Sequence, residues 1–186
     1  EIFDRAPSEA GAASVFVTGF FTMQLAFLRI FEPEENDRAF DLIALKVSSP
    51  AAWYTAKVSI ATLLGSILIY MVHILLFGMF QSPQNLAPSW GSLLLILITT
   101  HSMASLGILL ATMTLRINAR QILFPILYFP LTVPILLAAI QSWAFLASGQ
   151  GEFSSLWSSW LGLIIVFDLL FFSLGLLFYT ELLKSP

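Results

Sequence analysis

The amino-acid sequence contains five long apolar stretches, each close to the length of helix that crosses a lipid bilayer. A hydrocarbon core about 30 Å thick needs roughly 20 apolar residues of α-helix. Apolar residues occur all round each stretch, with no solvated face, as expected for helices buried in lipid and protein. The pattern predicts membrane spans at about residues 13–28, 53–80, 90–115, 122–146 and 161–182.

Composition supports a membrane protein and excludes several other classes. Hydrophobic residues make up 58% of the 186 residues and charged residues only 10%, whereas a soluble domain carries about 25% charged residues. The net charge of −3 comes with no basic stripe, which argues against a nucleic-acid partner. The absence of cysteine excludes disulfides, thiolate metal sites and a cysteine nucleophile. We therefore predict an all-α, polytopic transmembrane helix bundle that forms a single domain over residues 1–186.

The positions of the basic residues predict the orientation of the spans, because Lys and Arg near span ends are retained in the cytoplasm. If the spans alternate, seven of the eight basic residues fall on one side and only Arg5 on the other. This places the N-terminus of the chain outside and its C-terminus on the cytoplasmic side. Since the first residue is Glu1, we expect six spans with the first one missing from this chain; a protein with five spans is the alternative.

The only long charged segment, between the first two spans, predicts an amphipathic helix at about residues 33–47. Pro33 suits the first turn of a helix, and the acidic residues after it favour the positive end of the helix dipole. Apolar residues recur at helical spacing along one face. The helix either rests on lipid headgroups or docks on a cytoplasmic partner. In the second case its candidate contact residues are Glu34, Glu35, Asp37, Arg38, Asp41, Leu42 and Leu45.

The fourth span contains three prolines within about ten residues: Pro125, Pro130 and Pro134. Each proline removes a backbone donor and clashes with the carbonyl four residues before it, so we expect the helix to bend or break. The freed carbonyls then need partners within the protein or water. The span is either a static kinked helix or a hinge that lets the bundle change shape.

Three ionisable residues lie within the apolar spans. Asp168 is near the middle of the last span, where its charged form costs roughly 2.5–3.5 kcal/mol. We expect it to be paired, with His73 or His101 as candidate partners, and to serve either in assembly with a partner chain or in a transport path. The histidines could ligate haem iron, but no haem-binding signature surrounds them. Small residues four apart, Ala61 with Gly65 and Gly107 with Ala111, predict close helix contacts.

The sequence carries no catalytic motif. G-x-x-x-x-G-K-[ST], H-E-x-x-H and G-x-S-x-G are all missing, and no second intramembrane Asp completes an aspartyl dyad. The chain is therefore predicted not to be an enzyme, and it does not bind ATP through a P-loop.

Two stretches carry recognisable combinations of motifs. The first is LRIFEPEENDRAFDLIALKVSSPAAWYTAKV, residues 28–58, an acidic run followed by a Leu-rich helix, a Ser-Pro turn and a lysine that opens the next span. The second is SLGILLATMTLRINARQILFPILYFPLTVPILLAA, residues 105–139, with a small-residue span, a basic loop and a proline-rich span. Together they resemble the CcmB family, the permease of the cytochrome c maturation ABC system. The chain departs from the family where Arg38-Ala39 replaces a common acidic-Gly pair, which affects the details of the partner contact.

The resemblance implies an ABC-type complex in the bacterial inner membrane. The permease would pair with a CcmA-like ATPase and with CcmC-like and CcmD-like membrane subunits. ATP hydrolysis by the partner would be linked to haem delivery and to release of the haem chaperone. No cofactor is expected to bind this chain directly, and it shows no haem ligand set. Three other functions stay open: a permease of another ABC exporter for lipid or polysaccharide, a secondary transporter that uses Asp168, and a structural scaffold in a membrane complex.

Overall fold

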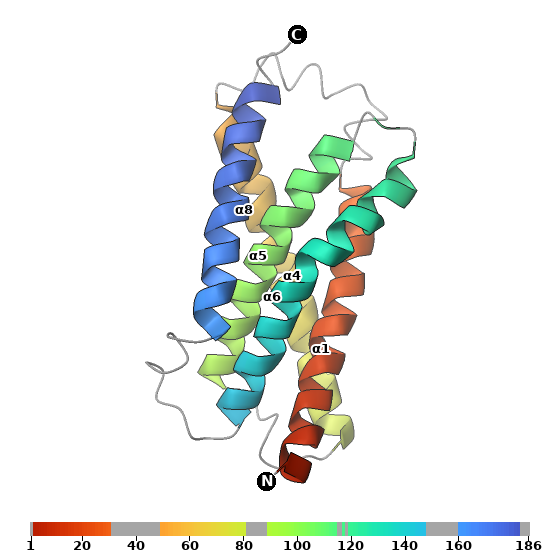
Figure 1. Cartoon of the computed structure of the whole chain (residues 1–186), viewed down its shortest axis with the longest axis vertical. Helices are drawn as coiled ribbons and strands as arrows, with labels where there is room; N and C mark the ends of the chain where they lie inside the picture. The colour runs from red at the N-terminus through yellow and green to blue at the C-terminus, as the bar shows by residue number, and fades with distance from the viewer. Residues whose placement is uncertain are drawn as a thin grey trace.

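The computed structural model describes residues 2–30, 49–80, 89–114, 117, 119–147 and 160–182, and within those ranges all long elements are α-helices with no β-strand. The five helices form an elongated bundle in which consecutive helices run in opposite directions (Figure 1). Each is long and apolar enough to cross a membrane. Their bounds are α1 (Ile2–Arg29), α4 (Pro50–Phe80), α5 (Trp90–Thr114), α6 (Arg120–Ala147) and α8 (Trp160–Leu182).

The five helices lie at the positions of the five predicted spans, with one clear difference at the start. The helix α1 begins at Ile2 rather than near residue 13, and its membrane-length part is Gly11–Arg29. The polar residues before Gly11 mark where α1 leaves the hydrocarbon region. They do not end the helix, because polar residues can also be helical in water. The predicted amphipathic helix at residues 33–47 lies outside the described residues.

Serine residues cap the starts of two helices. Before α5, the Ser92 amide donates to the Ser89 hydroxyl oxygen (3.1 Å) and the Ser89 amide to that of Ser92 (3.0 Å), a reciprocal arrangement like a capping box. Before α4, the Ser49 hydroxyl oxygen accepts from the Ala52 amide at 3.4 Å. The helix can therefore begin at Pro50, whose missing N–H is not needed in a first turn.

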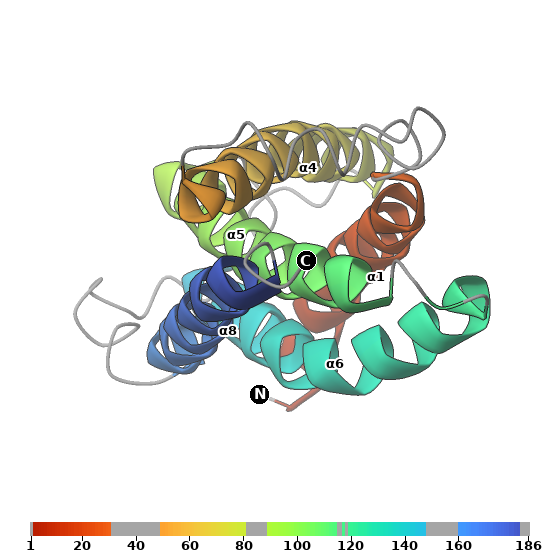
Figure 2. The ribbon, with the colours of Figure 1, turned by 90° about the horizontal axis from the view of Figure 1, so that it is seen from above.

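The helix α5 is the centre of the bundle and packs against each of the other four helices (Figure 2). Within the membrane-length segments, 72% of α5 is buried, compared with 22% of α8. Its residues from Ser102 to Thr112 are all buried. Most polar side chains of α5 are therefore enclosed by neighbouring helices. Those in its first half that remain partly exposed are the exception.

Two glycines let the helices approach closely, which confirms the prediction from the small-residue spacing. A Cβ at Gly107 would collide with the ring of Phe27 from α1. A Cβ at Gly65 would meet Met23 from α1 and Thr100 from α5, at 2.5 and 2.7 Å. The Phe27 ring also contacts the rings of Phe124 and Tyr128 from α6. Phe27 thus joins α1 to both α5 and α6.

The proline-rich helix α6 stays continuous over 28 residues although it contains all three prolines. It curves across the bundle instead of breaking (Figure 2). Within this part the Thr132 hydroxyl lies 2.8 Å from the Tyr128 carbonyl and 3.0 Å from that of Phe129, so a side chain adds a donor beside the prolines. Of the two outcomes predicted for this span, the structure has the bend.

Candidate functional site

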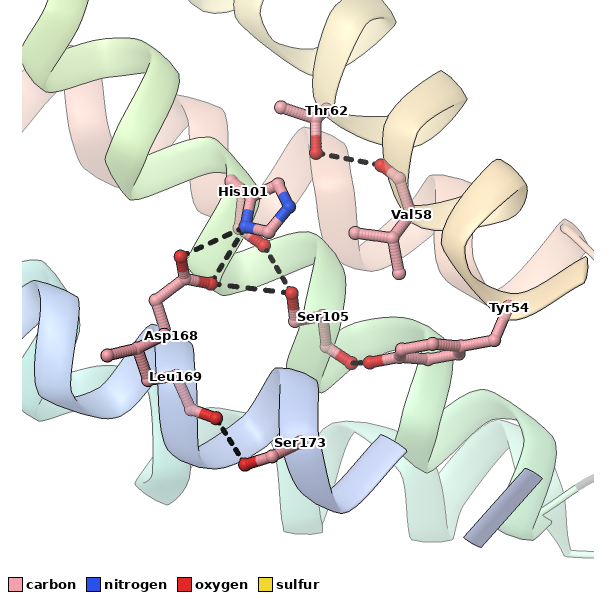
Figure 3. Close-up of polar contacts among 8 residues, drawn as sticks. All are labelled: Tyr54, Val58, Thr62, His101, Ser105, Asp168, Leu169 and Ser173. Carbon is pink, nitrogen blue, oxygen red and sulfur yellow. Dashed lines mark hydrogen bonds and ion pairs between the residues drawn. The ribbon is translucent and has the colours of Figure 1, made fainter. Parts of the chain in front are cut away.

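A histidine and an aspartate pair near the middle of the membrane-spanning bundle. His101 lies on α5 and Asp168 on α8, and the His101 Nδ1 atom is 2.8 and 3.0 Å from the two carboxylate oxygens of Asp168 (Figure 3). Their side chains are 33% and 19% exposed. Of the two partners predicted for Asp168, the structure places His101 beside it. A paired carboxyl group avoids most of the cost of an isolated charge in lipid.

Hydroxyl groups extend this pair along α5. The Ser105 hydroxyl, one turn after His101, lies 2.9 Å from the His101 carbonyl and 3.4 Å from the Asp168 carboxylate. The Tyr54 hydroxyl of α4 donates to the Ser105 carbonyl at 3.1 Å. Gly175 of α8 makes room for the Tyr54 ring, which a Cβ there would strike. The site therefore joins α4, α5 and α8 (Figure 3).

A second polar contact lies farther along the same face of α5. The Thr112 and Tyr179 hydroxyls are 2.8 Å apart, and the Tyr179 ring packs on those of Tyr54 and Trp53. His101, Ser105 and Thr112 are spaced four and seven residues apart, which puts them on one helical face. That spacing is visible in the sequence, but sequence reasoning did not single out Tyr54, Ser105, Thr112 or Tyr179.

His73, the other predicted partner, lies elsewhere on α4. It is fully buried, with its ring 4.7 Å from that of Trp143 on α6 and 5.8 Å from that of Tyr70. Neither of its ring nitrogens has a hydrogen-bond partner in the part of the chain that the structure describes. Among the residues that the structure describes, no three His, Asp or Glu side chains lie close enough together to hold a metal ion.

Two basic side chains hold the end of α1. The Arg120 Nη2 atom of α6 donates to the Phe27 carbonyl at 3.3 Å, and the Lys57 Nζ atom of α4 to the Ile30 carbonyl at 3.4 Å. Positive charge at a helix C-terminus interacts favourably with the helix dipole. The end of α1 that leads into residues 31–48 is therefore tied to α4 and α6. We call this the basic end of the bundle, defined by Arg29, Lys57 and Arg120.

The remaining predicted residues are placed as follows. On α6, Pro130 is exposed and Pro125 and Pro134 are half-buried, so the prolines lie beside the core-facing residues Phe124 and Tyr128. The seven candidate contact residues of the amphipathic segment lie outside the described residues: Glu34, Glu35, Asp37, Arg38, Asp41, Leu42 and Leu45.

Comparison with known proteins identifies the family. The family model of the CcmB protein matches residues 5–176, nearly the whole chain. Searches of curated proteins and of solved structures gave no significant match. The match covers α4, α5 and α6 entirely and most of α1 and α8, and it agrees with the all-helical membrane bundle. The chain is therefore a multi-pass inner-membrane protein of the CcmB family, a permease component of the ABC-type haem exporter for cytochrome c maturation.

Proposed function

We propose that this permease subunit couples ATP hydrolysis by a separate, CcmA-like ATPase to haem delivery and release of the haem chaperone. The match to the CcmB family over residues 5–176 is the observation that carries this proposal. The sequence has no P-loop of its own, so the ATPase is a partner chain. CcmC-like and CcmD-like membrane subunits complete the proposed complex, with haem as its cargo.

The basic end of the bundle faces the cytoplasm in this proposal. Arg29, Lys57 and Arg120 lie where α1 ends and where α4 and α6 begin, which is one end of an alternating bundle. Basic residues beside short loops are retained on the cytoplasmic side. The chain then starts in the periplasm and ends in the cytoplasm. Residues 31–48 join α1 to α4 on the side where the ATPase is.

The proposed path of coupling starts at the amphipathic segment. A displacement of residues 33–47 acts first on the end of α1. The hydrogen bonds from Lys57 and Arg120 to that end pass the displacement to α4 and α6. Phe27, which contacts Gly107 of α5 and the Phe124 and Tyr128 rings, adds a packing contact with the curved helix α6. The proline-rich part of α6 is then the element that changes shape.

Reversing the charges of Asp37 and Arg38 together is expected to abolish co-purification of the ATPase while membrane insertion stays normal. The two substitutions, Asp37→Arg and Arg38→Asp, leave the net charge unchanged but invert the pattern that a docking partner recognises. Co-purification of a tagged chain from detergent-solubilised membranes measures the effect.

The adjacent pair Asp4 and Arg5 provides a matched control, because the same reversal there falls at the opposite end of α1. The control variant is expected to retain the ATPase. Unchanged ATPase recovery with the Asp37/Arg38 variant would show that this segment does not dock the ATPase.

Replacing Pro130 and Pro134 by Ala is expected to straighten α6 and lower cytochrome c yield severalfold. Alanine restores the two backbone donors and removes the clash with the preceding turn, so the helix gains rigidity. Haem-stained gels of membrane fractions measure the yield. Pro88→Ala, in the segment before α5, is the control and should leave it unchanged. Normal yield from the Pro130/Pro134 variant would mean that the bend is merely tolerated.

A further inference from the structure

The outer nitrogen of His101, Nε2, has no hydrogen-bond partner among the residues that the structure describes. Only Nδ1 of the ring is used, in the contact with Asp168. No hydrogen bond reaches Nε2 from any residue that the structure describes, and this atom is not among those enclosed by protein. In Figure 3 it points away from Asp168. The buried nitrogens of His73 are enclosed, so the two histidines differ in what can reach them.

The protonation state of the His101–Asp168 pair decides whether Nε2 of His101 donates or accepts a hydrogen bond. If the pair is an imidazolium beside a carboxylate, both ring nitrogens carry hydrogen. If it is a neutral imidazole beside a protonated carboxyl group, that group donates to Nδ1 and the ring hydrogen is on Nε2. Both forms are neutral overall, and both present an outward N–H. A neutral imidazole with hydrogen on Nδ1 beside an ionised carboxylate would carry a net negative charge, which the membrane interior disfavours. The same imidazole beside a protonated carboxyl group would leave the carboxyl hydrogen without an acceptor in the pair, which is costly in hydrocarbon.

This N–H lies deep in the hydrocarbon region. His101 is about 16 Å from the start of α5 and about 20 Å from its end, at 1.5 Å per residue. Lipid headgroups do not reach that depth, and an unsatisfied donor in hydrocarbon is costly. Around it, the first half of α5 has an open strip, while the second half is buried. We define the open strip as Leu93, Leu94, Leu97, Ile98 and His101.

We propose that the open strip of α5 docks a transmembrane helix of another subunit, which presents a hydrogen-bond acceptor to the Nε2–H of His101. The acceptor is a hydroxyl, carboxamide or carboxylate oxygen at mid-membrane depth. A second copy of this chain fits poorly, because its own open strip would set a donor against a donor. The inference concerns a face other than the amphipathic segment, so it does not depend on how the ATPase docks.

Photocrosslinking in native membranes tests the proposal, with a photoreactive residue at Leu97 of the full chain. The probe should link to another polypeptide, within one helical turn of a residue carrying such an acceptor. Leu64, exposed on α4, is the control position and should give no such adduct. The double variant His101→Leu/Asp168→Leu removes the N–H without leaving the carboxyl group unpaired. This double variant should lower the yield of the photocrosslinked adduct by about three- to tenfold, which corresponds to one hydrogen bond between membrane helices.

His101→Gln keeps an N–H donor and should retain most of the adduct, whereas changing the partner's acceptor residue to Leu should lower it as the double variant does. If the double variant fails to insert, Leu97→Trp with the probe moved to Leu93 replaces it, because added bulk on an exposed position blocks docking without disturbing the core. Adducts with lipid alone, adducts within the same polypeptide or with a second copy of this chain, or an adduct yield unaffected by these substitutions would overturn the proposal.

Discussion

Replacing His101 by Leu is expected to destabilise the bundle by about 3 kcal/mol, while replacing His101 and Asp168 together by Leu recovers most of that loss. The single substitution leaves the Asp168 carboxyl group near the middle of the membrane without the imidazole that lies 2.8 Å away. The Ser105 hydroxyl, at 3.4 Å, replaces only part of that contact. The double substitution removes both polar groups and leaves apolar side chains.

Reversible unfolding in mixed detergent micelles, followed by the fluorescence of the five tryptophans, gives the free energies. The two single variants and the double variant form a thermodynamic cycle whose coupling energy isolates the pair. Asp168→Asn serves as the control, since it keeps a polar group within reach of the imidazole, and we expect it to cost less than His101→Leu. Additive effects of the two single substitutions would show that the pair contributes nothing to the fold.

Gly107→Leu is expected to destabilise the bundle by about 3 kcal/mol, at the upper end of the usual cost of overpacking a core. Even a Cβ at this position would strike the Phe27 ring, and the neighbouring rings of Phe124 and Tyr128 limit how far that ring can move. The central helix α5 would then have to move away from α1.

Gly78→Ala in α4 is the matched control, because no atom of the described residues lies within 4 Å of a Cβ there. Alanine favours helix over glycine by about 1 kcal/mol, so this variant should be neutral or slightly more stable. The same unfolding measurement compares the two glycines. Equal stability of the Gly107→Leu variant and the wild-type protein would mean that α1 and α5 can separate without loss.

The helices themselves were predictable because the bilayer imposes a length and an apolar composition on every span. Four of the five helices begin and end within about three residues of the predicted bounds. The exception, α1, begins at Ile2 because polar residues can continue a helix beyond the hydrocarbon. The proline pattern predicted bending or breaking of α6, and only its tertiary setting decided in favour of a bend.

Which polar residues meet was not predictable. The sequence offered His73 and His101 equally as partners for Asp168, since both lie in apolar spans. The choice depends on how each helix is rotated and which helix lies next to it. Glycines set those properties: Gly107 and Gly65 draw α5 and α4 against α1, and Gly175 admits Tyr54 beside α8. His73 then faces Trp143, and His101 faces Asp168.

The sequence by itself therefore determined the membrane location, the spans, the absence of a P-loop and the family motifs, because these depend on composition and local order along the chain. Only the tertiary structure decided the His101–Asp168 pair, the hold of Lys57 and Arg120 on α1, and the open strip on α5. The hydrogen-bonded contacts join residues 27 to 93 positions apart in the sequence. The open strip depends on which face of α5 the neighbouring helices leave uncovered. Such contacts result from side-chain packing between helices, which hydropathy and periodicity do not encode.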